Sequence, residues 1–149
     1  MGKIYYVMGK SASGKDTIYK RLVKKMPELG TVRMYTTRPI RDGETNGVEY
    51  IFTDEKQLQA MKDAGKVIEC RTYDTIYGPW SYFTADDGQI NLGTCSYLMM
   101  GTLESYEGLC KYYGAEVMVP LYIHVEDGVR LQRALNRENT QKNPKYAEM

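Results

Sequence analysis

The feature that most constrains how this chain can fold is a short glycine-bearing loop near its N-terminus, Gly9-Lys10-Ser11-Ala12-Ser13-Gly14-Lys15-Asp16-Thr17. The apolar run 4–8 precedes it, and apolar residues at helical spacing follow it over 18–26. Such a strand–loop–helix segment is typical of a phosphate-binding site, because the loop N–H groups and the helix N-terminus attract an anion. Lys15 has the position from which a lysine reaches the β- and γ-phosphates of a nucleotide. The alternative is a turn that binds nothing, but the flanking strand and helix favour the phosphate site.

The residue after the lysine departs from the usual pattern of such loops. A serine or threonine there would place a hydroxyl on magnesium, whereas this chain has Asp16. Two arrangements are open: Asp16 holds the metal as a carboxylate, directly or through water, or Thr17 provides the hydroxyl one residue later. Both residues are therefore candidate metal ligands.

Composition limits the kind of partner. A chain of 149 residues is expected to form one domain around a single core. The formal net charge of +1 gives no overall field that would favour nucleic acid or a membrane surface. The N-terminal apolar run is far shorter than a membrane span or a signal core. Cys70, Cys95 and Cys110 lie in separate segments without metal-site spacing, which is typical of buried thiols in a cytoplasmic protein.

Two arginines lie three positions apart in a second loop, residues 36–47. The glycines and the proline of this loop exclude a regular helix, and an alternating pattern predicts a strand over 48–53. Arg38 and Arg41 suit a phosphate dianion, because each planar guanidinium can donate two charge-assisted hydrogen bonds. A second phosphate site is therefore predicted. The alternative is a solvated loop with salt bridges to neighbouring carboxylates such as Glu44.

These two motifs in this order resemble the guanylate kinase family. The family pattern Thr-Thr-Arg-x-x-Arg-x-Gly-Glu-x-x-Gly-x-x-Tyr-x-Phe is similar to TTRPIRDGETNGVEYIF at 36–52. The resemblance implies a three-layer α/β fold of the P-loop NTPase-type kinases, with a central parallel sheet and a small acceptor-binding subdomain. It also implies a cytoplasmic enzyme that uses ATP and Mg²⁺ to phosphorylate GMP or dGMP. The expected partners are these small nucleotides, and neither nucleic acid nor a membrane.

The resemblance assigns roles to individual residues. The residues implied to hold ATP are Gly9, Ser11, Ala12, Ser13, Gly14, Lys15, Asp16 and Thr17. The residues implied to hold the acceptor phosphate are Arg38, Arg41, Tyr50 and Tyr77, the last in a Tyr77-Gly78 pair. Glu44 would be a supporting acceptor near the acceptor site or the metal. Glu69 would accept hydrogen bonds from guanine N1–H and the 2-amino group; an exposed strand glutamate is the alternative.

A helix with several arginines is predicted within residues 126–144. Arg133 and Arg137 lie one turn apart on one face of it. The resemblance implies that they belong to a lid over ATP and neutralise charge that builds up during transfer. With Lys15 and Arg38 they complete the set of candidate catalytic residues. A solvated basic helix face is the alternative.

Three departures from the family pattern concern the acceptor. Met34 stands where the family usually has a serine that recognises the guanine 6-oxo group, and Pro79 replaces a small hydroxyl residue. The segment TCSYLMMG at 94–101 lacks the aspartate that the family carries there. Two alternatives are therefore open: a related phosphokinase for another phosphorylated metabolite, such as ribose 1,5-bisphosphate, or a non-catalytic guanylate-kinase-like interaction module.

We expect a single domain over 1–149, with a core from 1–33 and 94–149 and an acceptor-binding subdomain from 34–93. Family members continue for several tens of residues past this point, which leaves open whether the chain is a truncated member. Further elements predicted by pattern and capping are strands over 31–35, 67–71 and 117–125 and helices after Asp54 and Thr102. Strands that alternate with helices predict a parallel sheet covered on both faces, with the nucleotide at the carboxyl ends of its strands.

Overall fold

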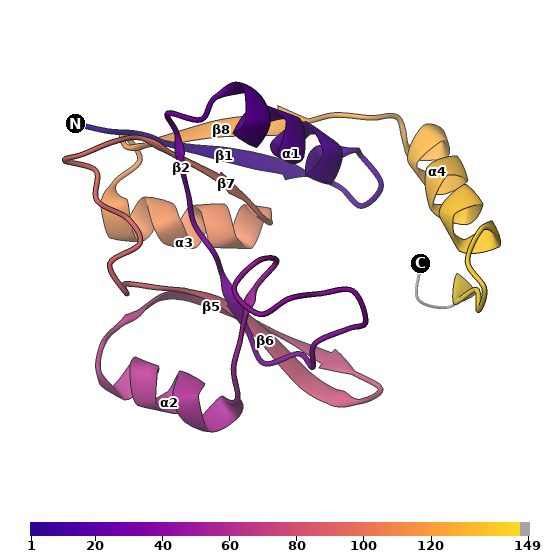
Figure 1. Cartoon of the computed structure of the whole chain (residues 1–149), viewed down its shortest axis with the longest axis horizontal. Helices are drawn as coiled ribbons and strands as arrows, with labels where there is room; N and C mark the ends of the chain where they lie inside the picture. Colours follow the sequence, from indigo (N-terminus) through magenta and orange to yellow (C-terminus); the bar gives the residue numbers. More distant parts are fainter. Residues whose placement is uncertain (147–149) are drawn as a thin grey trace.

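A computed structural model describes residues 1–146 of the chain. Within these residues a parallel sheet has the spatial order β2-β7-β1-β8, formed by β2 (Gly30–Thr31), β7 (Tyr97–Met100), β1 (Ile4–Gly9) and β8 (Met118–Ile123). Helices α1 (Lys15–Lys25) and α3 (Leu103–Tyr113) lie on opposite faces of this sheet (Figure 1). The predicted parallel sheet with helices on both faces is therefore confirmed.

A second, mixed sheet has the spatial order β4-β3-β6-β5. Its strands are β4 (Ile51–Phe52), β3 (Tyr35–Thr36), β6 (Gly78–Ala85) and β5 (Val67–Thr75). β3 pairs with β4 in parallel, whereas β6 pairs with both β3 and β5 in antiparallel. Helix α2 (Glu55–Asp63) packs on this second sheet, and α3 lies between the two sheets (Figure 1). The last helix, α4 (Asp127–Asn139), lies at the side of the molecule (Figure 1).

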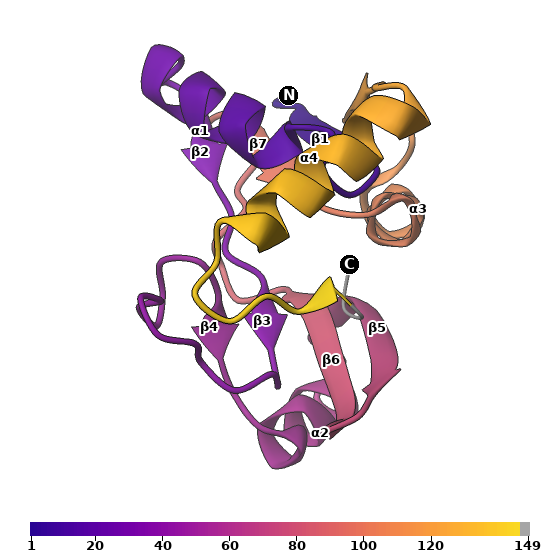
Figure 2. The same ribbon diagram turned by 90° about the vertical axis from the view of Figure 1, so that its right-hand side faces the viewer.

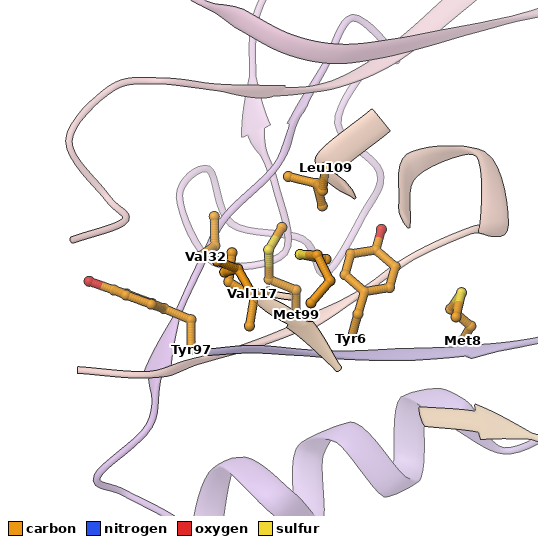
Figure 3. Close-up of a cluster of buried hydrophobic side chains, with 9 residues drawn as sticks. Tyr6, Met8, Val32, Tyr97, Met99, Leu109 and Val117 are labelled. Atoms are coloured by element: carbon orange, nitrogen blue, oxygen red, sulfur yellow. The ribbon is translucent and has the colours of Figure 1, made fainter. Parts of the chain in front are cut away.

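The main core lies between the parallel sheet and α3 (Figure 3). Its buried side chains come from the central strands, the crossing segment after β2 and the helix: Ile4, Tyr6, Met8, Val32, Tyr97, Met99, Leu109, Val117 and Met118. Tyr6 is fully buried, and its hydroxyl donates a hydrogen bond of 2.6 Å to Ser105 Oγ, so the buried polar atom is satisfied. A smaller cluster of Leu58, Phe83 and Ala85 lies between the second sheet and α2.

Strand β7 places Leu98 and Met99, within the segment 94–101, in the interior of the parallel sheet. β7 pairs with β1 on one side and with β2 on the other, and Leu98 and Met99 are almost fully buried. An ionised side chain at either position would lose its hydration without a partner. Burial therefore accounts for the apolar residues at positions 98 and 99.

Two of the predicted strands differ from the structure. The strand predicted over 31–35 is wrong as a single element, because β2 ends at Thr31 in the parallel sheet and β3 begins at Tyr35 in the mixed sheet. Residues between them carry the chain from one sheet to the other. The strand predicted over 48–53 is confirmed only at Ile51–Phe52, since the preceding residues form turns in which Gly47 N donates to Tyr50 O.

The predicted helices are confirmed together with their caps. Asp54 Oδ1 accepts a 2.8 Å hydrogen bond from Gln57 N, and Thr102 Oγ1 accepts one from Ser105 N at 3.3 Å. Leu103, on the first turn of α3, is 59% exposed and lies beyond the core. None of the helices in the described part of the chain is long and apolar enough to cross a membrane.

Close approach of α3 to β5 depends on Gly108. A Cβ atom at this position would lie only 2.6 Å from Glu69 Cβ. We expect Gly108→Ala to lower the free energy of unfolding by about 1 kcal/mol, because overpacking exceeds the gain in helix propensity. Urea denaturation measures this change. Gly128→Ala in α4 is the matched control, since nothing lies within 4 Å of its Cβ position, and it should leave stability equal or slightly higher. Equal effects of both substitutions would contradict the tight contact.

Candidate active site

The phosphate loop lies at the carboxyl end of β1, a central strand of the parallel sheet. The backbone is left-handed at Gly14, with φ of 89°, and at Ala12, with φ of 60°. A Cβ at Gly9 would lie 2.5 Å from Ser13 Oγ and 3.0 Å from Ile123 O, so the loop turns back tightly over the end of the strand. The predicted strand–loop–helix setting is therefore confirmed.

Two polar side chains of the loop point to an anion as its ligand. Lys15 Nζ donates to Gly9 O at 3.2 Å, which holds the ammonium group over the loop. Ser13 is 3% exposed, and its Oγ has no hydrogen-bond partner within residues 1–146. A buried hydroxyl without a partner is unfavourable by roughly 1–3 kcal/mol, so an external acceptor would complete it. The lysine, this hydroxyl and the start of α1 together form a site that suits phosphate oxygens.

The first turn of α1 carries the two candidate metal ligands. Asp16 and Thr17 are both exposed there, directly after Lys15. Magnesium prefers oxygen ligands and commonly combines one or two protein ligands with substrate phosphates and water. A carboxylate and a hydroxyl beside a phosphate loop therefore fit this ion. Within residues 1–146 no three His, Cys, Asp or Glu side chains are grouped as a metal site. The choice between Asp16 and Thr17 stays a prediction.

Helix α4 crosses in front of β1 and the start of α1 in Figure 2. Two of its arginines contact the phosphate loop. Arg130 Nη1 donates to Ser11 O at 3.0 Å, and Arg133 Nη1 approaches Ala12 O at 3.5 Å. Arg130 and Arg133 therefore both lie at the loop, and the predicted lid role of Arg133 stays a prediction. Arg137 is exposed, and no contact in the described part of the chain brings it to the loop. Helical spacing could not select between these neighbours, because both lie within one turn of Arg133.

Arg38 is the most buried of the candidate acceptor residues. It is 4% exposed, and its two terminal nitrogens each donate to one oxygen of Glu44 at 2.9 Å. Its guanidinium also lies 5.6 Å from the ring centroids of Tyr50 and Phe52. A bound phosphate would therefore share Arg38 with Glu44, while the exposed Arg41 side chain remains available. Glu44 Oε1 also accepts from Arg41 N at 2.8 Å, so Glu44 orders the whole loop.

The ion pair of Glu44 predicts a stability change at acid pH. Hydrogen bonds from Arg38 lower the pKa of Glu44 from 4.5 to about 2. The ionised carboxylate therefore stabilises the fold fully above pH 4.5, and this contribution is lost as the pH falls toward 2. We expect Glu44→Gln to lower the free energy of unfolding by about 1–2 kcal/mol at pH 7 and to reduce its fall below pH 4.5. Urea denaturation between pH 2 and 7 measures the stability at neutral pH and its fall in acid. Glu28→Gln, at an exposed glutamate, is the control. Parallel pH profiles for wild type and Glu44→Gln would show that the Arg38–Glu44 pair does not cause the acid dependence.

Glu69 and Arg71 form a nearly buried ion pair on the face of β5 toward α3. Glu69 is 9% and Arg71 8% exposed, so the alternative of an exposed strand glutamate is wrong. Arg71 Nε donates to Glu69 Oε2 at 3.1 Å, and Thr84 Oγ1 donates to Oε1 at 2.8 Å. Arg71 Nη1 donates to Thr102 Oγ1 at 3.1 Å, which ties β5 to the start of α3. Sequence analysis missed Arg71; its only signal is its place two residues after Glu69 on the same strand.

Tyr77 and Gly78 lie where β5 turns into β6. Gly78 has φ of 102°, which the turn requires. Tyr77 is 68% exposed, and its ring stacks on Trp80 with centroids 5.9 Å apart. No contact among the described residues joins Tyr77 to Arg38, so its part in acceptor binding stays a prediction.

Aromatic side chains connect the Arg38 loop with the Glu69–Arg71 pair. Burial raises the pKa of Tyr50, with a further contribution from the charge of Asp16 at the start of α1. Tyr50 also contacts Tyr82 edge to face, with ring centroids 5.7 Å apart, and Tyr82 lies 6.0 Å from the guanidinium of Arg71. The structure thus brings Arg38, Tyr50 and the Glu69–Arg71 pair to one side of the second sheet.

This combination of a parallel sheet, a phosphate loop after its central strand and a small second sheet defines the P-loop NTPase-type kinases. The family model described as guanylate kinase matches residues 1–81, which is more than half of the chain. The chain therefore belongs to the guanylate kinase family.

Individual relatives agree over the N-terminal half. The guanylate kinase of Legionella pneumophila (strain Lens) is 37% identical over 78 residues, which cover 52% of this chain and 37% of that protein. The guanylate kinase of Coxiella burnetii is 37% identical over 76 residues, which cover 50% and 37%. The matched segment thus spans little more than a third of these curated relatives.

A solved structure extends the likeness to the rest of the fold. The crystal structure of guanylate kinase from Anaplasma phagocytophilum superposes with a TM-score of 0.67 over 91% of this chain and 67% of that chain. Sequence identity is 20%, so this likeness concerns the fold.

Proposed function

We propose that this protein is a cytoplasmic nucleoside-monophosphate kinase that transfers the γ-phosphoryl group of ATP to GMP or dGMP. The observation that carries the proposal is the pairing of two anion sites. One is the phosphate loop with Lys15, and the other is the loop that carries Arg38 and Arg41. A donor site beside an acceptor site is the arrangement that phosphoryl transfer between two nucleotides requires.

In this proposal the residues position phosphates and neutralise charge, without a covalent intermediate. A bond forms between an acceptor phosphate oxygen and the γ-phosphorus while the bond from the γ-phosphorus to its bridging oxygen breaks. Lys15 and the loop N–H groups would hold the donor phosphates, and Arg38, Arg41, Tyr50 and Tyr77 would hold the acceptor phosphate. Magnesium, held through Asp16 or Thr17 when bound, would supply further neutralisation of the donor phosphates.

The arginines of α4 would complete the donor site. Arg133 already lies against the loop together with Arg130, and Arg137 would join them if α4 rotates or closes over bound ATP. Residues 126–144 would then act as the lid. We also propose that residues 34–93 form the acceptor-binding subdomain, since the second sheet and α2 fall within these bounds.

The test is ADP release from ATP and magnesium with GMP, dGMP, AMP, UMP and ribose 1,5-bisphosphate as separate acceptors. We expect turnover with GMP and dGMP that exceeds turnover with AMP. If ribose 1,5-bisphosphate is the one acceptor that gives activity, the proposed phosphoryl transfer would stand, but the proposed acceptor would be wrong. ATP binding without turnover on any acceptor, measured by calorimetry, would contradict the kinase proposal and favour an interaction module.

A further inference from the structure

A groove of about 440 Å³ lies between β5 and α3, and the Glu69–Arg71 pair lines it. The α3 side of the groove carries Glu104, Glu107 and Lys111 around Gly108. Its volume lies within the range of small-molecule sites. Two nearly buried side chains of opposite charge in such a groove offer a hydrogen-bond donor directly beside an acceptor.

Arg71 keeps unused hydrogen-bonding capacity. Its Nε donates to Glu69 and its Nη1 to Thr102, whereas among residues 1–146 the single contact of Nη2 is the Met34 sulfur, a weak acceptor, at 3.8 Å. Since each terminal nitrogen carries two N–H groups, one N–H on each has no partner within residues 1–146. A buried guanidinium with open donors is costly unless a ligand oxygen accepts them.

Glu69 also keeps open acceptor positions. Its two oxygens each accept one hydrogen bond, from Arg71 and from Thr84, and a carboxylate offers about four lone-pair positions. The pair can therefore accept from one ligand group and donate to the adjacent one at the same time.

The position of the pair relates it to the acceptor phosphate site. Tyr82 lies between the Arg71 guanidinium and Tyr50, and Tyr50 in turn lies against Arg38. A molecule whose phosphate is held at Arg38 would extend along this aromatic row and place its other end at Glu69 and Arg71.

We propose that Arg71 is a specificity-determining residue that donates to the oxo group of the acceptor base, beside the ring N–H that the resemblance to the family assigns to Glu69. This inference rests on the proposed kinase function. The nucleotides that this pair would select as phosphoryl acceptors carry an oxo group next to a ring N–H, as 6-oxopurine nucleoside monophosphates do. An adenine edge would place an amino donor against the guanidinium donors. The family usually has a serine at the position of Met34, and its hydroxyl would donate to the 6-oxo group. In this chain Arg71, which contacts Met34, would supply that hydrogen-bond donor instead.

The experiment measures binding of GMP, IMP and AMP to the full chain by calorimetry, independently of turnover. We expect wild type to bind GMP and IMP at least about 10-fold more tightly than AMP. Arg71→Met should weaken GMP and IMP binding by about 30-fold and change AMP binding by less than about threefold. Arg21→Met, at an exposed arginine on α1, is the matched control and should leave all three affinities unchanged.

A rescue variant separates this role from a purely structural one. Met34 lies against Arg71, so Met34→Ser in the Arg71→Met background should place a hydroxyl donor near the same oxo group and recover about 10-fold in GMP affinity. Arg71→Lys, which keeps the charge, serves if Arg71→Met fails to fold, and it should also reduce the preference for GMP over AMP. Equal loss of affinity for all three nucleotides, or an unchanged preference in these variants, would overturn the inference.

The two proposals fail in distinguishable ways. A wild-type preference for GMP that disappears in Arg71→Met, without formation of GDP from ATP, would refute the kinase function and support base recognition by Arg71. Formation of GDP from ATP, together with a preference for GMP that Arg71→Met leaves unchanged, would support the kinase function and refute base recognition by Arg71. A wild-type chain that binds none of the three nucleotides would overturn both.

Discussion

Lys15→Ala is expected to lower the rate of phosphoryl transfer by at least about 100-fold while the fold is retained. A positioned cation acts most strongly on the charge that develops in the transition state, and removal of one such group typically has this effect. Lys15 makes one described hydrogen bond, to Gly9 O, so the free energy of unfolding should change by less than about 1 kcal/mol. Initial rates of ADP release at saturating ATP and GMP measure the first effect, and urea denaturation measures the second.

The control is Lys20→Ala, which removes an exposed lysine one turn further along α1. It should leave turnover within about twofold of wild type, because its charge lies on the solvent face of the helix. Equal turnover in the Lys15 and Lys20 variants would show that the loop does not act on the donor phosphates.

Arg38→Met is expected to lower the free energy of unfolding by about 3 kcal/mol, because it leaves Glu44 without its bidentate partner. It also removes the guanidinium that lies against Tyr50 and Phe52. Acceptor binding should weaken at the same time, since the loop loses both a phosphate donor and its internal tie. Urea denaturation and calorimetry with GMP measure the two effects.

Arg41→Met distinguishes phosphate binding from loop stability. Arg41 has an exposed side chain in the same loop, so its removal should weaken GMP binding while stability stays within about 0.5 kcal/mol of wild type. The double variant Arg38→Met/Glu44→Gln should recover part of the stability lost in Arg38→Met, because no unpaired carboxylate is left. If Arg38→Met and Arg41→Met unfold at the same urea concentration, the Arg38–Glu44 pair does not hold the loop.

The parts of the fold that sequence predicted correctly are those with local signals. The phosphate loop is defined by spacing between adjacent elements, and the caps at Asp54 and Thr102 act within one helical turn. The strand over 31–35 was predicted wrongly because its outcome depends on distant contacts and not on local signals. An apolar pattern shows that a residue is buried, but not which of two sheets buries it, and Val32 enters the main core while Tyr35 pairs in the mixed sheet.

The candidate site shows the same division between local and distant contacts. Arg38, Arg41 and Glu44 lie within one short motif, and the alternative pairing of Arg38 with Glu44 is part of the observed geometry. Arg71 acts through Thr102, which is 31 positions away in the sequence, and through Met34, which is 37 positions away. Arg130 reaches Ser11 across 119 positions. Such contacts depend on the packed sheets and cannot be read from spacing.

The most direct test of the kinase proposal follows the γ-phosphoryl group itself. The protein, in excess over ATP labelled at the γ-phosphorus, is mixed with magnesium and unlabelled GMP. The reaction is quenched after a single turnover and its products are separated. Our account predicts that the label appears in GDP, and that Lys15→Ala slows its appearance by at least about 100-fold. Label that appears only as free phosphate, or that stays in ATP while ATP is shown to bind, would contradict it.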